Sequence, residues 1–98
     1  MSNFQPLILI YNQEIDIIEE PSDLENLLYG MSETQQKDVV LLDKTASYRT
    51  LKNIPLPALS SRELATLVKH YLAKEGQCCL AKIDHITPAQ AFDLLAIN

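Results

Sequence analysis

Three polar residues stand where two apolar runs of the sequence end. Asp43 follows the run 39–42, and Asp84 and His85 follow the run 78–83. Ligands of open α/β sheets collect beyond the carboxyl ends of strands, so parallel strands here would bring the three side chains to one rim. Two carboxylates suit Mg²⁺, and a histidine suits proton transfer. Asp43, Asp84 and His85 are therefore the candidate ligand site. The simpler interpretation is that short polar residues form the turns at strand ends.

The two cysteines, Cys78 and Cys79, are adjacent. Neighbouring side chains of a strand point to opposite faces, so the two sulfurs would diverge and would not share a metal ion. Adjacent cysteines close no loop, and the CxxC spacing of redox and zinc sites is absent. We interpret them as core thiols, with a reactive role for either as the alternative. We predict no catalytic residue, no cofactor and no metal site.

Basic side chains gather on one predicted helix. Arg62, Lys69, His70 and Lys74 all fall within residues 60–76. Such a patch would suit an acidic partner, although basic residues along a surface helix are more often its solvated face. Lys82 lies inside an apolar run; its stem would lie along the sheet, with a buried catalytic lysine as the alternative.

Short apolar or alternating runs predict the strands that would position these residues. The predicted strands are Leu7–Tyr11, Glu14–Ile18, 39–42, 47–51 and 78–83. The first two are separated by Asn12 and Gln13, which indicates a hairpin. Because Asn-Gln is not the favoured Asn-Gly pair, a longer loop that includes Glu14 is an alternative.

Three helices are predicted between and after the strands. Ser22 and Glu25 form a capping box before the first, and Gly30 is placed to end it in a left-handed conformation. The second runs from a Ser60 cap to Gly76, with a broad apolar stripe on one face. The last begins at Thr87 and directs an apolar stripe inward. That stripe is Ala91, Phe92 and Leu95. Residues 31–37 are expected to be a loop.

The predicted fold is α+β. Its element order is β-hairpin, helix, strand or hairpin, helix, strand, helix, which favours a mixed sheet of four or five strands with three helices packed on it. We expect the 98 residues to form one domain, 1–98, because a chain of this size buries about 65% of its unfolded surface and can build one core.

Composition excludes several classes of protein. The chain has 13 acidic and 8 basic residues, a net charge of −5, and 47% hydrophobic residues, so it is a folded chain that is not built to bind nucleic acid or anionic lipid. No apolar run approaches the roughly 20 residues that span a bilayer, and the residues before the first run lack the basic region of a secretory signal, so we expect no signal peptide. Unpaired cysteines in a small soluble protein predict the cytoplasm.

The apolar strand followed by Gln13-Glu14-Ile15, the run 39–43 and the segment 76–83 resemble small uncharacterised bacterial proteins of similar length. This resemblance covers most of the chain and implies no activity.

These patterns predict a non-enzymatic protein–protein interaction module of unknown partner, with a homodimer as one candidate. Three helices would cover one sheet face well and leave part of the other open, and an open apolar face is typical of an interface. The first alternative is a small-ligand or enzymatic site at the Asp43, Asp84 and His85 rim. A third is an acidic decoy for a nucleic-acid-binding protein.

Overall fold

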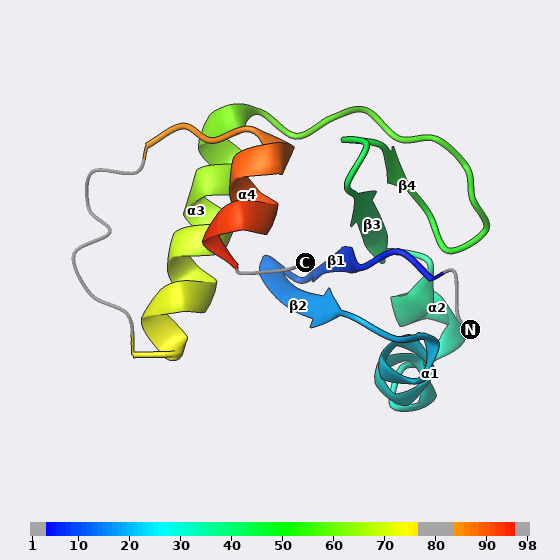
Figure 1. Ribbon diagram of the computed structural model, residues 1–98. Coiled ribbons are helices and arrows are strands. Elements are labelled where there is room, and N and C mark those ends of the chain that lie inside the picture. Colours follow the sequence, from blue (N-terminus) through cyan, green and yellow to red (C-terminus); the bar gives the residue numbers. More distant parts are fainter. Residues whose placement is uncertain (1–3, 77–83, 96–98) are drawn as a thin grey trace.

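The computed structural model describes residues 4–76 and 84–95 (Figure 1). Its strands are β1 (Leu7–Tyr11), β2 (Glu14–Ile18), β3 (Val40–Asp43) and β4 (Tyr48–Arg49). Its helices are α1 (Pro21–Tyr29), α2 (Glu33–Gln36), α3 (Ser61–Lys74) and α4 (Pro88–Leu94). The α+β class is confirmed. The strand predicted at 78–83, with Cys78, Cys79 and Lys82, lies outside the described residues.

The four described strands form one sheet in the order β2-β1-β3-β4. Every pair among them is antiparallel, and the register places Leu9 opposite both Asp16 on β2 and Leu41 on β3. The mixed sheet was predicted because a helix between consecutive strands permits parallel pairing. The described strands on either side of α1, β2 and β3, are not neighbours in the sheet, and no described pair is parallel. Pairing by the segment 78–83 lies outside the described residues.

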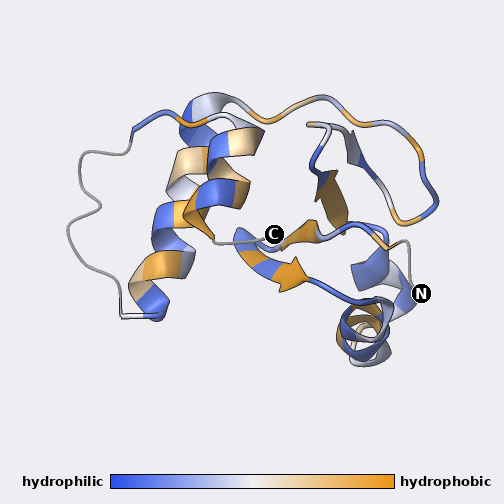
Figure 2. Cartoon of the chain, viewed as in Figure 1, coloured by the Kyte–Doolittle hydropathy of each residue, from blue (hydrophilic) through white to orange (hydrophobic). Residues whose placement is uncertain are grey.

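Side chains alternate between two apolar layers because successive strand residues point to opposite faces. Ile8, Ile10 and Leu42 face α3 and α4, whereas Leu7 and Leu9 face the opposite way. That second layer is closed by half-buried residues of α1, namely Leu24, Leu27 and Leu28. Figure 1 shows α3 and α4 on one side of the sheet and α1 and α2 on the other. Figure 2 shows that α1 is hydrophobic on one side only.

The expectation of an open sheet face is therefore wrong for the described part of the chain. The prediction assumed that the three helices cover mainly one face of the sheet. Instead the helices divide, with the two from the first half of the chain on one face and the two from the second half on the other. An uncovered sheet face consequently gives no motive for self-association.

The edge strand β4 is covered by the chain that follows it. Leu56 donates its backbone N–H to the Tyr48 carbonyl at 2.8 Å, and Thr50 donates to the Ile54 carbonyl at 2.9 Å. Pro55, which bridges to Arg49, has no N–H to offer a further strand. The segment 54–56 therefore occupies the free edge of β4 among the described residues.

The structure confirms some of the predicted helix starts and ends. Ser60 and Thr87 are the N-caps of α3 and α4, as expected. Gly76 follows α3 with φ of 84°, the left-handed conformation typical of a helix stop. Gly30 ends α1 with φ of −85°, so the left-handed ending predicted there is wrong.

Two other boundaries also differ. Helix α1 starts earlier than the Ser22 box implied, because the Asp23 side chain accepts from the Glu20 N–H at 3.0 Å and Pro21 takes the first helical position. The expected loop 31–37 contains α2, whose Ser32 cap accepts from the Gln35 N–H at 3.1 Å.

Candidate functional site

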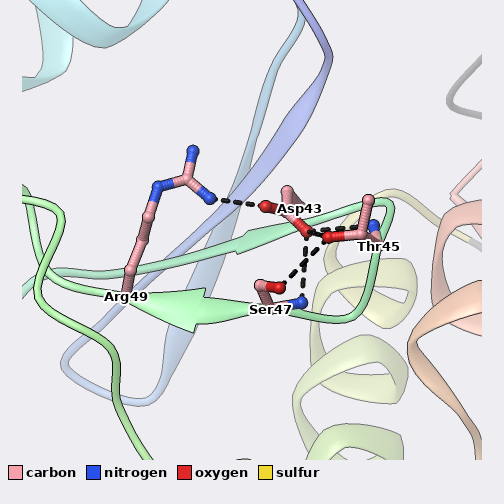
Figure 3. Close-up of polar contacts among 4 residues, drawn as sticks. All are labelled: Asp43, Thr45, Ser47 and Arg49. Carbon is pink, nitrogen blue, oxygen red and sulfur yellow. Dashed lines mark hydrogen bonds and ion pairs between the residues drawn. The ribbon is translucent and has the colours of Figure 1, made fainter.

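Asp43 sits at the centre of a hydrogen-bond network inside the β3–β4 hairpin (Figure 3). Its Oδ1 accepts from the Thr45 N–H at 2.9 Å, the Thr45 hydroxyl at 2.5 Å and the Ser47 N–H at 3.1 Å. Its Oδ2 accepts from Arg49 Nη1 at 2.6 Å. Burial raises the pKa of Asp43, but the bonds from Thr45, Ser47 and Arg49 outweigh it and the net pKa is lowered. The carboxylate is thus committed to holding the turn.

Asp84 and His85 contact α3 at two places, near its middle and at its first residue. The Asp84 carboxylate lies 3.9 Å from Lys69 Nζ, and His85 Nδ1 lies 3.1 Å from the Ser61 hydroxyl. The Ile86 N–H also donates to the Ser61 carbonyl at 3.2 Å. A serine beside a histidine resembles a nucleophile and its base, which a third residue normally orients. No carboxylate bonded to His85 is among the described contacts, and the contacts fasten the segment before α4 to α3.

The three rim residues do not share a contact in the described structure. Asp43 lies on the same face as Leu41, which packs against α1, and all its side-chain partners fall within residues 45–49. Asp84 and His85 contact α3, which covers the opposite face. Among the described residues, no group of three or more His, Cys, Asp or Glu side chains is placed to hold a metal ion. The ligand role of this rim remains a prediction.

A groove runs between the β1–β2 turn and the N-terminal half of α3, and we call it the α3 groove. Its volume is about 670 Å³, within the range of small-ligand sites. It is lined by Ile10, Asn12, Gln13, Glu14, Leu59, Arg62, Glu63, Thr66, Leu67 and His70. Apolar side chains of Ile10, Leu59 and Leu67 belong to or pack against the core, and polar side chains surround them.

The turn that forms one wall of the α3 groove is strained. Asn12 and Gln13 have φ of 53° and 62°, and Tyr11 pairs directly with Glu14, so the hairpin closes with two left-handed residues. A turn of this kind favours glycine at its second position, and a left-handed glutamine costs of order 1–3 kcal/mol. The two-residue hairpin is confirmed, and the longer loop including Glu14 is not formed.

Some of the charged side chains around the α3 groove have bonding partners and others do not. Glu14 is bonded to Lys74, and this bond and charge lower the pKa of Glu14. Glu63 accepts from the Ser60 hydroxyl at 3.2 Å. The Arg62 guanidinium has no side-chain partner among the described residues, and its exposed side chain lines the groove.

The sequence indicated part of this groove and missed the rest. Arg62 and His70 belong to the basic patch predicted on the second helix, and both line the groove. Lys69 and Lys74 of that patch are paired with Asp84 and Glu14 instead. Gln13 was predicted as a turn residue but not as a binding residue. The absence of glycine from the turn was the signal in the sequence that could have indicated it.

A family model described as a protein structure with unknown function, DUF4144, matches residues 5–95. The chain belongs to the DUF4144 family. The match confirms the predicted likeness to uncharacterised proteins, and it assigns no activity to DUF4144 proteins. No curated protein and no solved structure matches the chain. No helix in the part of this DUF4144 protein that the structure describes is long and apolar enough to cross a membrane.

Proposed function

We propose that this protein is a non-enzymatic protein-interaction module of the bacterial cytoplasm, and that it binds an acidic segment of another protein in the α3 groove. The segment would place an apolar side chain on the groove floor and a carboxylate on Arg62. The observation that carries this proposal is the Arg62 guanidinium, which has no partner in the part of the chain that the structure describes and lies beside apolar groove residues.

The floor of the α3 groove suits an apolar side chain. Ile10 is 8% exposed and belongs to the core, and Leu59 and Leu67 are half-buried around it. A side chain inserted here would remove apolar surface from water at about 25 cal/mol per Å². The volume of about 670 Å³ accommodates a few residues of a peptide, so the predicted partner is a short segment.

The charge of the occupant follows from which groups are already paired. Lys74, which is not part of the groove lining, pairs with Glu14. Glu63 accepts a hydrogen bond from the neutral Ser60 hydroxyl and keeps its charge. Among the described residues that line the groove, Arg62 is a cation without an ion-pair partner, so it is the group proposed to bind an added carboxylate. A guanidinium binds a carboxylate through two parallel hydrogen bonds, which gives both energy and orientation. The hydrogen bond and charge of Lys74, and to the smallest extent His70, lower the pKa of Glu14.

The strained turn is consistent with this role. Residues held in rarely populated backbone conformations cluster at binding sites, where the strained shape serves a partner rather than the free fold. Gln13 contributes both the strain and a groove-lining amide.

A defined peptide pair tests the proposal. The probes are a fluorescein-labelled hexapeptide of alternating leucine and aspartate, and its leucine–lysine counterpart. We expect only the aspartate peptide to raise anisotropy, and its addition to shift the NMR amide signals of residues 10–14 and 59–70. Arg62→Ala should weaken binding by at least about tenfold, and Arg62→Lys should recover part of it.

Lys52→Ala is the matched control, because Lys52 is a cation that does not line the α3 groove. It should leave the affinity unchanged. Equal binding of both peptides, binding of neither, or amide shifts confined to other residues would reject the α3 groove as the docking site.

A further inference from the structure

A second groove lies between α2 and the turn 50–54, and we call it the α2 groove. Its volume is about 590 Å³. It is lined by Glu33, Gln36, Lys37, Thr50, Leu51, Lys52 and Ile54. None of these residues lines the α3 groove, so this surface is independent of the function proposed above.

The α2 groove is held in shape by its own turn. The Thr50 hydroxyl accepts from the Lys52 N–H at 3.2 Å and the Ile54 N–H at 3.1 Å, and Asn53 has φ of 68°. This closed turn presents Ile54, which is 55% exposed. This exposed aliphatic side chain at the edge of the groove can pack against a bound partner.

A projecting aromatic side chain stands on the neighbouring helix. Tyr29, the last residue of α1, is 95% exposed. The Gln36 side chain of α2 donates to the carbonyls of Leu28 and Met31 at 3.1 and 3.2 Å, which fastens one wall of the α2 groove to the end of α1. Tyr29 and the α2 wall of this groove therefore lie on two helices that these hydrogen bonds join.

Charges on the two features are complementary. Glu25 precedes Tyr29 by four residues, so the two exposed side chains share one face of α1. Neither Lys37 nor Lys52 has a side-chain partner among the described residues, and both line the α2 groove. Glu33 also lines the α2 groove, so its two ammonium groups leave the groove with a net positive charge. A tyrosine with a carboxylate one turn away complements that charge, and its ring can pack against Leu51 and Ile54.

We infer that the occupant of the α2 groove is Tyr29 of a second copy of this chain. Each copy carries both a projecting ring and a groove. Two copies can therefore form a two-fold pair in which each inserts its Tyr29 ring into the α2 groove of the other. Each buried tyrosine removes about 150–250 Å² of surface from water. Two such contacts form an interface below the size of stable dimers, so the pair is weak, with a dissociation constant on the order of 100 µM.

Sedimentation velocity between about 10 µM and 1 mM tests this inference. We expect the mean mass to rise with concentration, and the NMR amide signals of residues 25–30 and 50–54 to shift together. Tyr29→Ser should weaken association by at least about tenfold. Leu94→Ser is the matched control, because Leu94 is another exposed apolar residue, 38% accessible, on the distant helix α4.

Charge reversal identifies the pairing. Glu25→Lys and Lys52→Glu should each weaken association, and the double variant should restore it, because each reversed charge then meets a reversed partner. A chain that stays monomeric to about 1 mM, or a Tyr29→Ser variant that associates like the parent, overturns the inference. Arg62→Ala should not change self-association, so the result is distinguishable from failure of the α3 groove.

Discussion

Arg49 Nη1 lies 2.6 Å from Asp43 Oδ2, and this ion pair joins the two strands of the β3–β4 hairpin. The aspartate simultaneously accepts hydrogen bonds from both sides of the turn, at Thr45 and Ser47. One carboxylate thus fixes the conformation of a turn and the pairing of the shortest strand.

Asp43→Ala should destabilise the fold by about 1–3 kcal/mol, because two backbone N–H groups and a guanidinium lose their acceptor. Asp43→Asn is the control: its amide oxygen can still accept in the turn, but it does not carry the charge that Arg49 meets, so its loss should be smaller. Urea unfolding at neutral pH measures both. Equal stability of Asp43→Ala and the parent would contradict the network.

The same carboxylate makes a pH prediction. Its pKa is lowered in the folded state, so its stabilising contribution is present above the unfolded value of about 3.9 and is lost as pH falls through the folded pKa. The stability difference between the parent and Asp43→Ala should therefore shrink below about pH 4. A difference that stays constant across this range would show that the charge of Asp43 is not involved.

Gln13→Gly should stabilise the protein by about 1 kcal/mol, because glycine adopts the left-handed conformation at this turn position without a steric penalty. Gln13→Ala keeps the Cβ atom and should bring no comparable gain. Thermal unfolding compares the three chains. If Gln13→Gly raises the melting temperature and also weakens binding of the acidic peptide, the glutamine side chain contributes to binding and lowers the stability of the fold. A glycine variant no more stable than the parent would refute strain at the turn.

Leu9→Ala and Leu42→Ala should each cost about 2–5 kcal/mol, since both side chains are fully buried but on opposite faces of the sheet. Denaturant unfolding of both, with the exposed Leu94→Ala as reference, measures whether each face is a true core. A Leu9→Ala variant as stable as Leu94→Ala would mean that α1 does not close the second face.

Gly76→Ala and Gly30→Ala form a matched pair. Alanine at position 76 must adopt φ near 84° and should cost about 1 kcal/mol. Alanine at position 30 keeps an ordinary φ, and its Cβ meets nothing closer than the Leu27 carbonyl at 4.0 Å, so its effect should stay within a few tenths of a kcal/mol. Similar losses for both variants would contradict the backbone conformations of the two helix ends.

Local patterns in the sequence predicted much of the fold because they reflect short-range physics. The apolar stripe from Leu64 to Leu72 and the Ser60 cap placed α3 closely. Helix α2 has only four residues and no periodic stripe, so it was mistaken for a loop, although Ser32 and Gln35 carry a capping signal.

Long-range features escaped prediction because periodicity does not specify which face a helix covers. Nothing in the spacing of Leu24, Leu27 and Leu28 indicates that they lie opposite α3 and α4 rather than beside them. The same limit applies to the candidate site. Asp43 was correctly placed at a strand end, but its partners are set by the geometry of its own turn. The α3 groove depends on the approach of residue 12 to residue 62, which only tertiary structure provides.

Because α1 is only partly buried, we expect it to be the part of the described structure that opens first. No residue of α1 is fully buried, whereas Leu7 to Ile10 of β1 are all buried. Amide protons of α1 should therefore exchange with solvent deuterium through partial opening, while those of β1 await global unfolding. Such an opening would expose the leucines of β1 and β3 that α1 covers, and we expect heat-induced aggregation to start from that partly opened state.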